Sequence, residues 1–277
     1  MPPPPSARSA AAAPGPPVPA ILGHDEHGDG PPVLLVHGVA FGPWAFDAVA
    51  ADLARDHRVV VVHRRGYGDS PAPCARHRPE DQAQEILALL DHLGVGRATA
   101  LGVSGGATVL TAIAMAAPER LDAAVLHEPA LGPLAPGVHA LISGLARAVG
   151  AAASPSAGAE VVAAALAGPR TWGALGTAGR AEARRPAEAV CFEVPFFARF
   201  APTATELGAL RALPVVASVG ERSGAERREA AGVLVRAAGA VCALVPGAAN
   251  LAHIESPAAL ADLVRRAVPT TATEEER

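Results

Sequence analysis

The stretch Ala98-Thr99-Ala100-Leu101-Gly102-Val103-Ser104-Gly105-Gly106 decides the fold of this chain. Its first six residues predict a buried parallel strand, and an alanine-rich helical pattern begins directly after the serine. Gly-x-Ser-x-Gly at a strand-to-helix turn is the pattern of a nucleophile elbow, in which a strained backbone lifts the serine hydroxyl clear of the sheet. Gly102 and Gly106 suit this turn, because a Cβ at either position would collide with the neighbouring strand and helix. We therefore expect Ser104 to be a nucleophile.

A second apolar run, at residues 33–36, ends in His37-Gly38-Val39. A strand followed by His-Gly is where such a sheet places a second backbone donor for an oxyanion. We expect the amides of Val39 and Gly105 to form this oxyanion hole. His37 is expected to fix the loop beneath it, at the wall of the substrate site.

Four motifs together resemble the α/β-hydrolase superfamily, in the single-domain lidded type found in actinobacteria. They are His37-Gly38, Arg65-Gly66-Tyr67-Gly68-Asp69-Ser70, Gly102–Gly106 and His127-Glu128-Pro129. The resemblance covers residues 20–268. It implies an α/β fold, with a doubly wound, mostly parallel sheet and an inserted helical cap. The motifs are specific for this fold and not for a substrate.

The predicted organisation follows the pattern of elements along the chain. Residues 20–130 and 206–268 alternate strand and helix and are expected to form the α/β-hydrolase core. Residues 131–205 show only alanine-rich helical stretches interrupted by Gly and Pro, and are expected to be the cap. The Pro/Ala-rich tail 1–19 and the acidic tail 269–277 are expected to be disordered.

Composition narrows the class of protein. A chain of 277 residues, half of them hydrophobic, can bury a large core. The formal net charge is −4, and no basic patch or aromatic ladder points to nucleic acid. The three cysteines are unpaired by spacing, so no disulfide framework, metal site or cofactor is expected. No apolar run approaches a membrane span and no signal-peptide pattern is present, which predicts a cytoplasmic protein. The oligomeric state does not follow from the sequence.

Aromatic residues gather in the expected cap. Phe196 and Phe197 lie in a phenylalanine-rich segment, and Trp172 precedes them. They either hold the cap helices together or face the nucleophile and bind a hydrophobic small molecule.

The resemblance fails at two of the three catalytic positions that it implies. The family's acid follows the strand that ends near Val219, in a Gly-x-x-Asp turn, but here Ser223 stands at that position. The family's histidine closes a Gly-x-Gly-His pattern, but here Asn250 stands at that position. Two other residues are therefore considered, Glu128 as the acid and His253 as the base.

Glu128 follows the strand after the elbow helix, where some lidded relatives, haloalkane dehalogenases among them, carry their carboxylate. Strand alternation would send His127 and Glu128 to opposite faces, so at most one of them points into the site. Glu221 is a further candidate for the acid, since it lies in the usual turn but is offset by two positions. Alternatively, Glu128 makes only a structural hydrogen bond to a backbone amide.

His253 lies three residues beyond Asn250, and three residues span up to about 10 Å. A shifted loop could thus bring its ring to Ser104; otherwise His253 is a residue of the site wall. Asn250 cannot accept a proton near neutral pH, but it can orient a water or a substrate carbonyl.

Three hypotheses follow. The first is a serine-dependent hydrolase or acyltransferase that uses Ser104, His253 and Glu128, with a displaced or degraded histidine. The second is a lyase, cyclase or cofactor-free enzyme that uses Ser104 and Asn250 as hydrogen-bonding groups. The third is a protein that keeps the pocket for binding alone.

Overall fold

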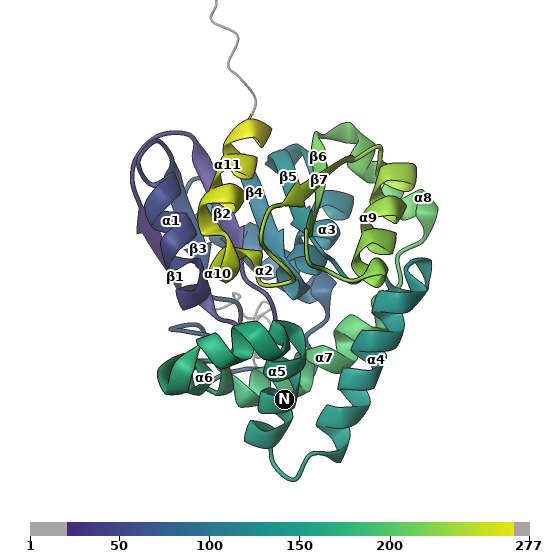
Figure 1. Cartoon of the computed structure of the whole chain (residues 1–277). Helices are drawn as coiled ribbons and strands as arrows, with labels where there is room; N and C mark the ends of the chain where they lie inside the picture. The colour runs from purple at the N-terminus through teal and green to yellow at the C-terminus, as the bar shows by residue number, and fades with distance from the viewer. Residues whose placement is uncertain (1–20, 269–277) are drawn as a thin grey trace, which may run out of the picture.

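The computed structural model describes residues 21–268, so the two predicted tails lie outside the described residues (Figure 1). These residues form a seven-stranded sheet of order β1-β3-β2-β4-β5-β6-β7, in which only β1 runs antiparallel to its neighbour. The predicted doubly wound, mostly parallel sheet is confirmed. Its strands are β1 (His24–His27), β2 (Pro32–Val36), β3 (Arg58–Val62), β4 (Ala98–Val103), β5 (Leu121–His127), β6 (Val215–Gly220) and β7 (Val241–Val245).

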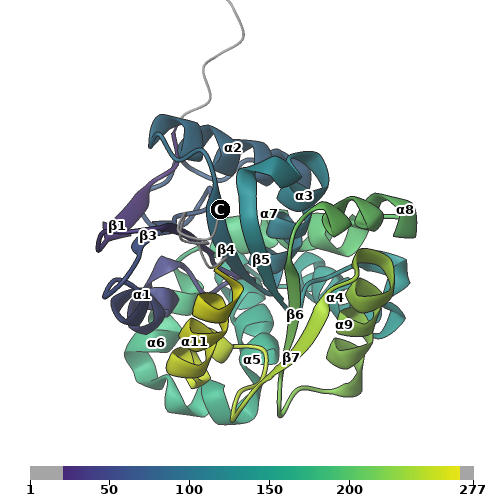
Figure 2. The same cartoon turned by 90° about the horizontal axis from the view of Figure 1, so that it is seen from above.

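The two faces of the sheet are covered by different helices, because side chains alternate along each strand. In β2, Leu34 and Val36 pack on one face with α2 (Pro79–His92), α3 (Gly105–Ala116) and α9 (Ala225–Ala238). Val33 and Leu35 pack on the other face with α1 (Asp47–Leu53) and α11 (Pro257–Ala267). Figure 2 shows α1 and α11 side by side. The central strands are therefore buried on both faces.

All residues between β5 and β6 that carry regular structure are helical. Four of these helices, which we call the helical insertion, lie together below the sheet in Figure 1. Ser154 begins the second helix as its N-cap by accepting a hydrogen bond from Ala157 N at 3.2 Å, and the same helix is broken at Gly168 (φ 68°) before Pro169. The helical insertion comprises α4 (Pro136–Ala151), α5 (Pro155–Ala174), α6 (Gly176–Arg184) and α7 (Ala187–Arg199), and the short α8 (Ala204–Leu207) follows it.

None of the helices within residues 21–268 combines the length and apolar character that crossing a bilayer requires.

Candidate active site

Ser104 stands between β4 and α3 with a positive φ of 53° and a ψ of −118°. Its amide donates a hydrogen bond to the carbonyl of His127 at 2.8 Å, which ties the turn to the neighbouring strand. The turn is possible only because its flanking glycines lack a Cβ. A Cβ on Gly102 would lie 2.6 Å from Ala107 Cα, and one on Gly106 would lie 2.0 Å from the carbonyl oxygen of Val36. The local sequence thus produces a strained serine at the carboxyl end of a central strand.

The loop after β2 meets the start of α3 beside this serine. An ideal Cβ on Gly38 would lie 3.3 Å from Ser104 Cβ, and one on Gly105 would lie 3.4 Å from Val39 N. The structure therefore brings Ser104, Val39 and Gly105 together, the three residues that the sequence assigns to the nucleophile and the oxyanion hole.

A narrow cavity with about 20 Å³ of free volume lies next to these three residues, under the helical insertion. Apolar side chains of α4, α5 and α7 make most of its wall: Ile142, Leu145, Val162, Leu166, Val194 and Phe197.

Of the three aromatic residues expected to bind substrate, only Phe197 lines the cavity. Trp172 is half-buried with the Arg180 guanidinium 5.4 Å from its ring centroid, and Phe196 has the Arg199 guanidinium at 5.8 Å. Trp172 of α5 thus contacts an arginine of α6, whereas Phe196 contacts an arginine of its own helix, α7.

His37 fixes the loop from behind and does not line the cavity. Its Nδ1 donates to the carbonyl of Gly38 at 2.9 Å, and its Nε2 accepts from the amide of Arg64 at 3.2 Å. Burial, and then the charge of Arg64, lower the pKa of His37 well below its ordinary value. The ring is therefore neutral near pH 7, as this pair of hydrogen bonds requires.

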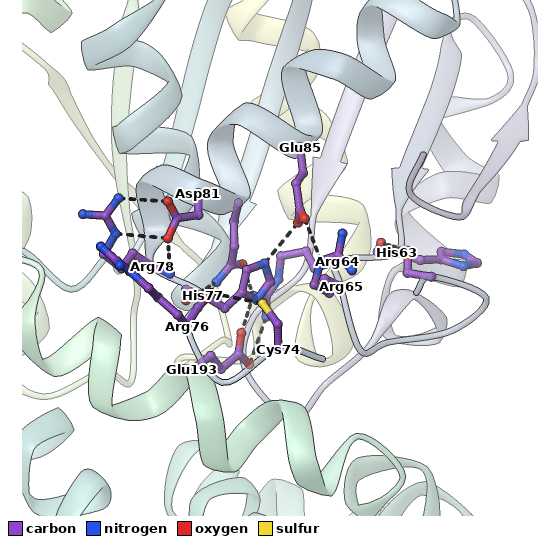
Figure 3. Close-up of polar contacts among 12 residues, drawn as sticks. His63, Arg64, Arg65, Cys74, Arg76, His77, Arg78, Asp81, Glu85 and Glu193 are labelled. Atoms are coloured by element: carbon purple, nitrogen blue, oxygen red, sulfur yellow. Dashed lines mark hydrogen bonds and ion pairs between the residues drawn. The ribbon is translucent and has the colours of Figure 1, made fainter. Parts of the chain in front are cut away.

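A buried polar cluster that the sequence analysis missed links the same loop to the helical insertion. The Arg64 guanidinium donates to the carbonyls of His37 at 2.9 Å and Gly38 at 2.8 Å, and it pairs with Glu193 of α7 at 2.5 Å (Figure 3). The Tyr67 hydroxyl donates to Glu193 and accepts from the amide of Ala40 at 3.1 Å. A lone glutamate within the apolar run of α7 was the available signal for this cluster.

Glu128 follows β5 with a positive φ of 53°, so it does not continue the alternation of the strand. The expectation that His127 and Glu128 point to opposite faces is therefore wrong: His127 Nε2 lies 3.8 Å from Glu128 Oε1. The carboxylate accepts hydrogen bonds from Gly220 N at 2.9 Å, from the Ser223 hydroxyl and from Asn250 Nδ2 at 3.0 Å. Ser223, which stands at the family's acid position, thus donates to the carboxylate that follows β5.

The pKa of Glu128 reflects these surroundings. Burial by itself would raise it, but His127 and Arg227 together with the hydrogen-bond donors outweigh burial and lower the pKa. Glu128 is therefore ionised at neutral pH. Glu221, the other candidate for the acid, is exposed and accepts a hydrogen bond from Gly247 N at 2.8 Å.

Asn250 contacts the Glu128 carboxylate, whereas His253 packs against an aromatic ring. Asn250 donates to Glu128, and its buried Oδ1 has no hydrogen-bond partner among the described residues. His253 lies in α10 (Ala252–Glu255) with its ring centroid 5.0 Å from that of Phe46, and neither ring nitrogen is hydrogen-bonded to any residue in 21–268. Burial, and then His127, lower the pKa of His253 to about 3. The structure does not bring His253 into hydrogen-bond contact with Ser104 or Glu128.

No three His, Cys, Asp or Glu side chains within the described part of the chain are arranged as a set that could hold a metal ion.

Comparison with known proteins agrees with this geometry. A family model described as the alpha/beta hydrolase fold matches residues 31–180. A hydrolase from Pseudomonas aeruginosa PA01 superposes with a TM-score of 0.73 at 25% identity, over 89% of this chain and 94% of that one. Esterase YbfF of Escherichia coli is 32% identical over 91 residues, which are 33% of this chain and 35% of the esterase.

A Pseudomonas putida protein, the dihydrolipoyllysine-residue acetyltransferase component of an acetoin cleaving system, is 35% identical over 94 residues. The match covers 33% of this chain and 25% of that protein. The chain thus spans about a quarter to a third of the length of these two curated relatives.

Proposed function

Because this chain belongs to the α/β-hydrolase fold family, we propose that it acts on an ester or other acyl bond of a hydrophobic small molecule, with Ser104 as the nucleophile. One observation carries the proposal: a strained serine faces an apolar cavity beside the amides of Val39 and Gly105. Backbone strain of about 1–3 kcal/mol persists only where the surrounding structure enforces it. A protein that only binds its ligand has no need of a strained serine.

In the proposed reaction, Ser104 Oγ bonds to the carbonyl carbon and the carbonyl oxygen becomes negative. The amides of Val39 and Gly105 donate hydrogen bonds to that oxygen. The bond to the leaving group then breaks, and the serine proton passes through water to the departing group. A second water hydrolyses the acyl-serine to the free acid and restores the Ser104 hydroxyl. Helices α4–α7 act as the cap that surrounds the acyl chain and excludes water.

The serine proton has no imidazole to accept it in this site. Asn250 has no basic nitrogen, and a pKa of about 3 makes His253 a very weak base. We therefore propose a degraded histidine rather than a displaced one. Acylation should then depend strongly on the leaving group, and acyl bonds with acidic leaving groups should react first.

A second candidate is non-hydrolytic chemistry, in which Ser104 and Asn250 act as hydrogen-bonding groups. The buried Oδ1 of Asn250 favours it, because Glu128 holds the other end of the amide and Oδ1 remains available to a substrate donor. This candidate needs no acyl-serine.

The experiment that separates the two is labelling with a fluorophosphonate, read as intact mass. The wild type should gain one phosphonyl group slowly, and Ser104→Ala should gain none. Equal labelling of both would remove Ser104 as the nucleophile. No labelling of the wild type together with rapid labelling of Asn250→His would favour the second candidate. If neither the wild type nor Asn250→His is labelled, the protein binds its ligand without reacting with it.

A further inference from the structure

Arg227 is the one charged residue among the described residues that line the Ser104 cavity. It extends from α9 and is only 5% exposed. Burying a guanidinium is costly unless hydrogen bonds satisfy it, so its position in an otherwise apolar wall needs a reason.

Pairing with Glu128 does not use the guanidinium fully. Arg227 Nε lies 3.5 Å from Glu128 Oε2, and Nη1 lies 3.5 Å from the Glu128 carbonyl oxygen. Strong charge-assisted hydrogen bonds are about 2.7–2.9 Å long. The carboxylate of Glu128 already accepts from Gly220, Ser223 and Asn250. Among residues 21–268, the one hydrogen bond of the Arg227 side chain is this long contact from Nη1, and Nη2 has none.

We propose that Arg227 binds a carboxylate of the substrate, so that the substrate class is an apolar acid that also carries the acyl bond. The inference rests on the proposed function: Ser104 meets the carbonyl at one end of the substrate, and Arg227 binds the carboxylate at its other end. A planar guanidinium matches the two oxygens of a carboxylate. The apolar walls from α4, α5 and α7 contact the chain between the two ends. Glu128 faces the same guanidinium, but its own three donors reduce its repulsion of a second carboxylate.

The test compares octanoate with octanamide, which share a chain and differ only in the charge of the head group. Dissociation constants are measured by calorimetry on the full chain, without any reaction. Octanoate should bind at least about 10-fold more tightly than octanamide, since a hydrogen bond to a charged group is stronger than a neutral one. Arg227→Met should abolish that ratio and change octanamide binding less than about 2-fold. Arg236→Met, which removes an exposed arginine of the same helix, should leave both constants unchanged.

Equal binding of the two ligands by the wild type, or no binding of either, overturns the proposal. So does an unchanged ratio in Arg227→Met. If that variant does not fold, Arg227→Lys replaces it and should reduce the ratio without abolishing it, because it keeps the charge and loses the planar fork. Fluorophosphonate labelling keeps the two proposals apart. Octanoate preference without Ser104 labelling supports the carboxylate site and contradicts acyl chemistry. Ser104 labelling without octanoate preference supports acyl chemistry and contradicts the carboxylate site.

Discussion

Asn250 donates a hydrogen bond from Nδ2 to Oε2 of Glu128 at 3.0 Å. The Glu128 carboxylate therefore contacts an amide at the position where the family carries an imidazole. Two further donors, Gly220 N and the Ser223 hydroxyl, also hold the carboxylate in place. In the proposed function, Glu128 is an oriented acid and Ser104 a strained nucleophile, and Asn250 stands where a base would lie between them.

Asn250→His should raise kcat/KM for a p-nitrophenyl ester by about 100- to 10,000-fold, the usual contribution of general-base catalysis. Glu128 already offers the acceptor that would orient the new ring. Steady-state hydrolysis of p-nitrophenyl butyrate checks this. Asn250→Ala is the control and should bring no gain, and Glu128→Gln added to Asn250→His should remove most of it. A histidine variant as slow as the wild type would contradict the assignment of position 250.

Ser104→Gly should be more stable than Ser104→Ala by about 1 kcal/mol. Glycine adopts a positive φ without strain, and this gain exceeds the larger chain entropy that glycine loses on folding. Ser104→Ala itself should match the wild type in stability, since alanine at φ 53° is strained in the same way. Both variants should lose all turnover of activated esters. Urea denaturation measures the stabilities, and equal midpoints for the two variants would show that the turn stores no strain.

Glu193→Gln should lower the free energy of unfolding by about 3 kcal/mol, because it leaves the buried guanidinium of Arg64 without its counter-charge. Urea denaturation at neutral pH gives this value. Glu188→Gln is the matched control, since Glu188 is exposed on the same helix. A loss as small as that of the control would mean that the ion pair contributes nothing to stability.

The stability of the protein should rise with pH between about pH 3 and 6.5, in part through His253. Its folded pKa of about 3 lies below the unfolded value of 6.5, so in this window the unfolded chain binds the extra proton and acid favours unfolding. At pH 5 the difference is about 2 kcal/mol for this residue, at 1.36 kcal/mol per pKa unit. His37, whose pKa is also lowered, acts in the same direction.

His253→Leu should therefore reduce the difference in unfolding free energy between pH 5 and pH 7.5. Leucine has a similar volume and no ring nitrogens to protonate. Denaturation curves at the two pH values measure the effect, with His92→Gln as a control that removes one exposed imidazole. An unchanged difference in His253→Leu would show that His253 does not drive the acid sensitivity.

The sequence predicted the features that depend on local steric rules. The glycines around Ser104 are spaced for one turn only, since added Cβ atoms would overlap the neighbouring backbone. The fold and the meeting of Val39 with Gly105 could be predicted for the same reason. The hydrogen bond between Glu128 and Asn250 could not be predicted. It depends on a positive φ at Glu128, and a glutamate in the sequence does not indicate that conformation.

The orientation of helical side chains was equally hard to predict. Phe196 and Phe197 are adjacent, yet only the second lines the cavity, because the helix registers of α4, α5 and α7 together decide which face is inward. A three-residue reach made His253 a candidate for the base. The chain instead turns into α10, which places the ring against Phe46.

The ion pair between Arg64 and Glu193 also constrains how a substrate enters. Moving α7 away from the sheet would separate buried charges, because Glu193 would leave Arg64, whose guanidinium also holds the carbonyls of His37 and Gly38. The opposite wall of the cavity is built differently, since α5 supplies Val162 and Leu166 and then breaks at Gly168. One wall of the cavity is thus ion-paired to the loop after β3, and another belongs to a helix that breaks two residues beyond Leu166. We expect a substrate to enter past α5 rather than past α7.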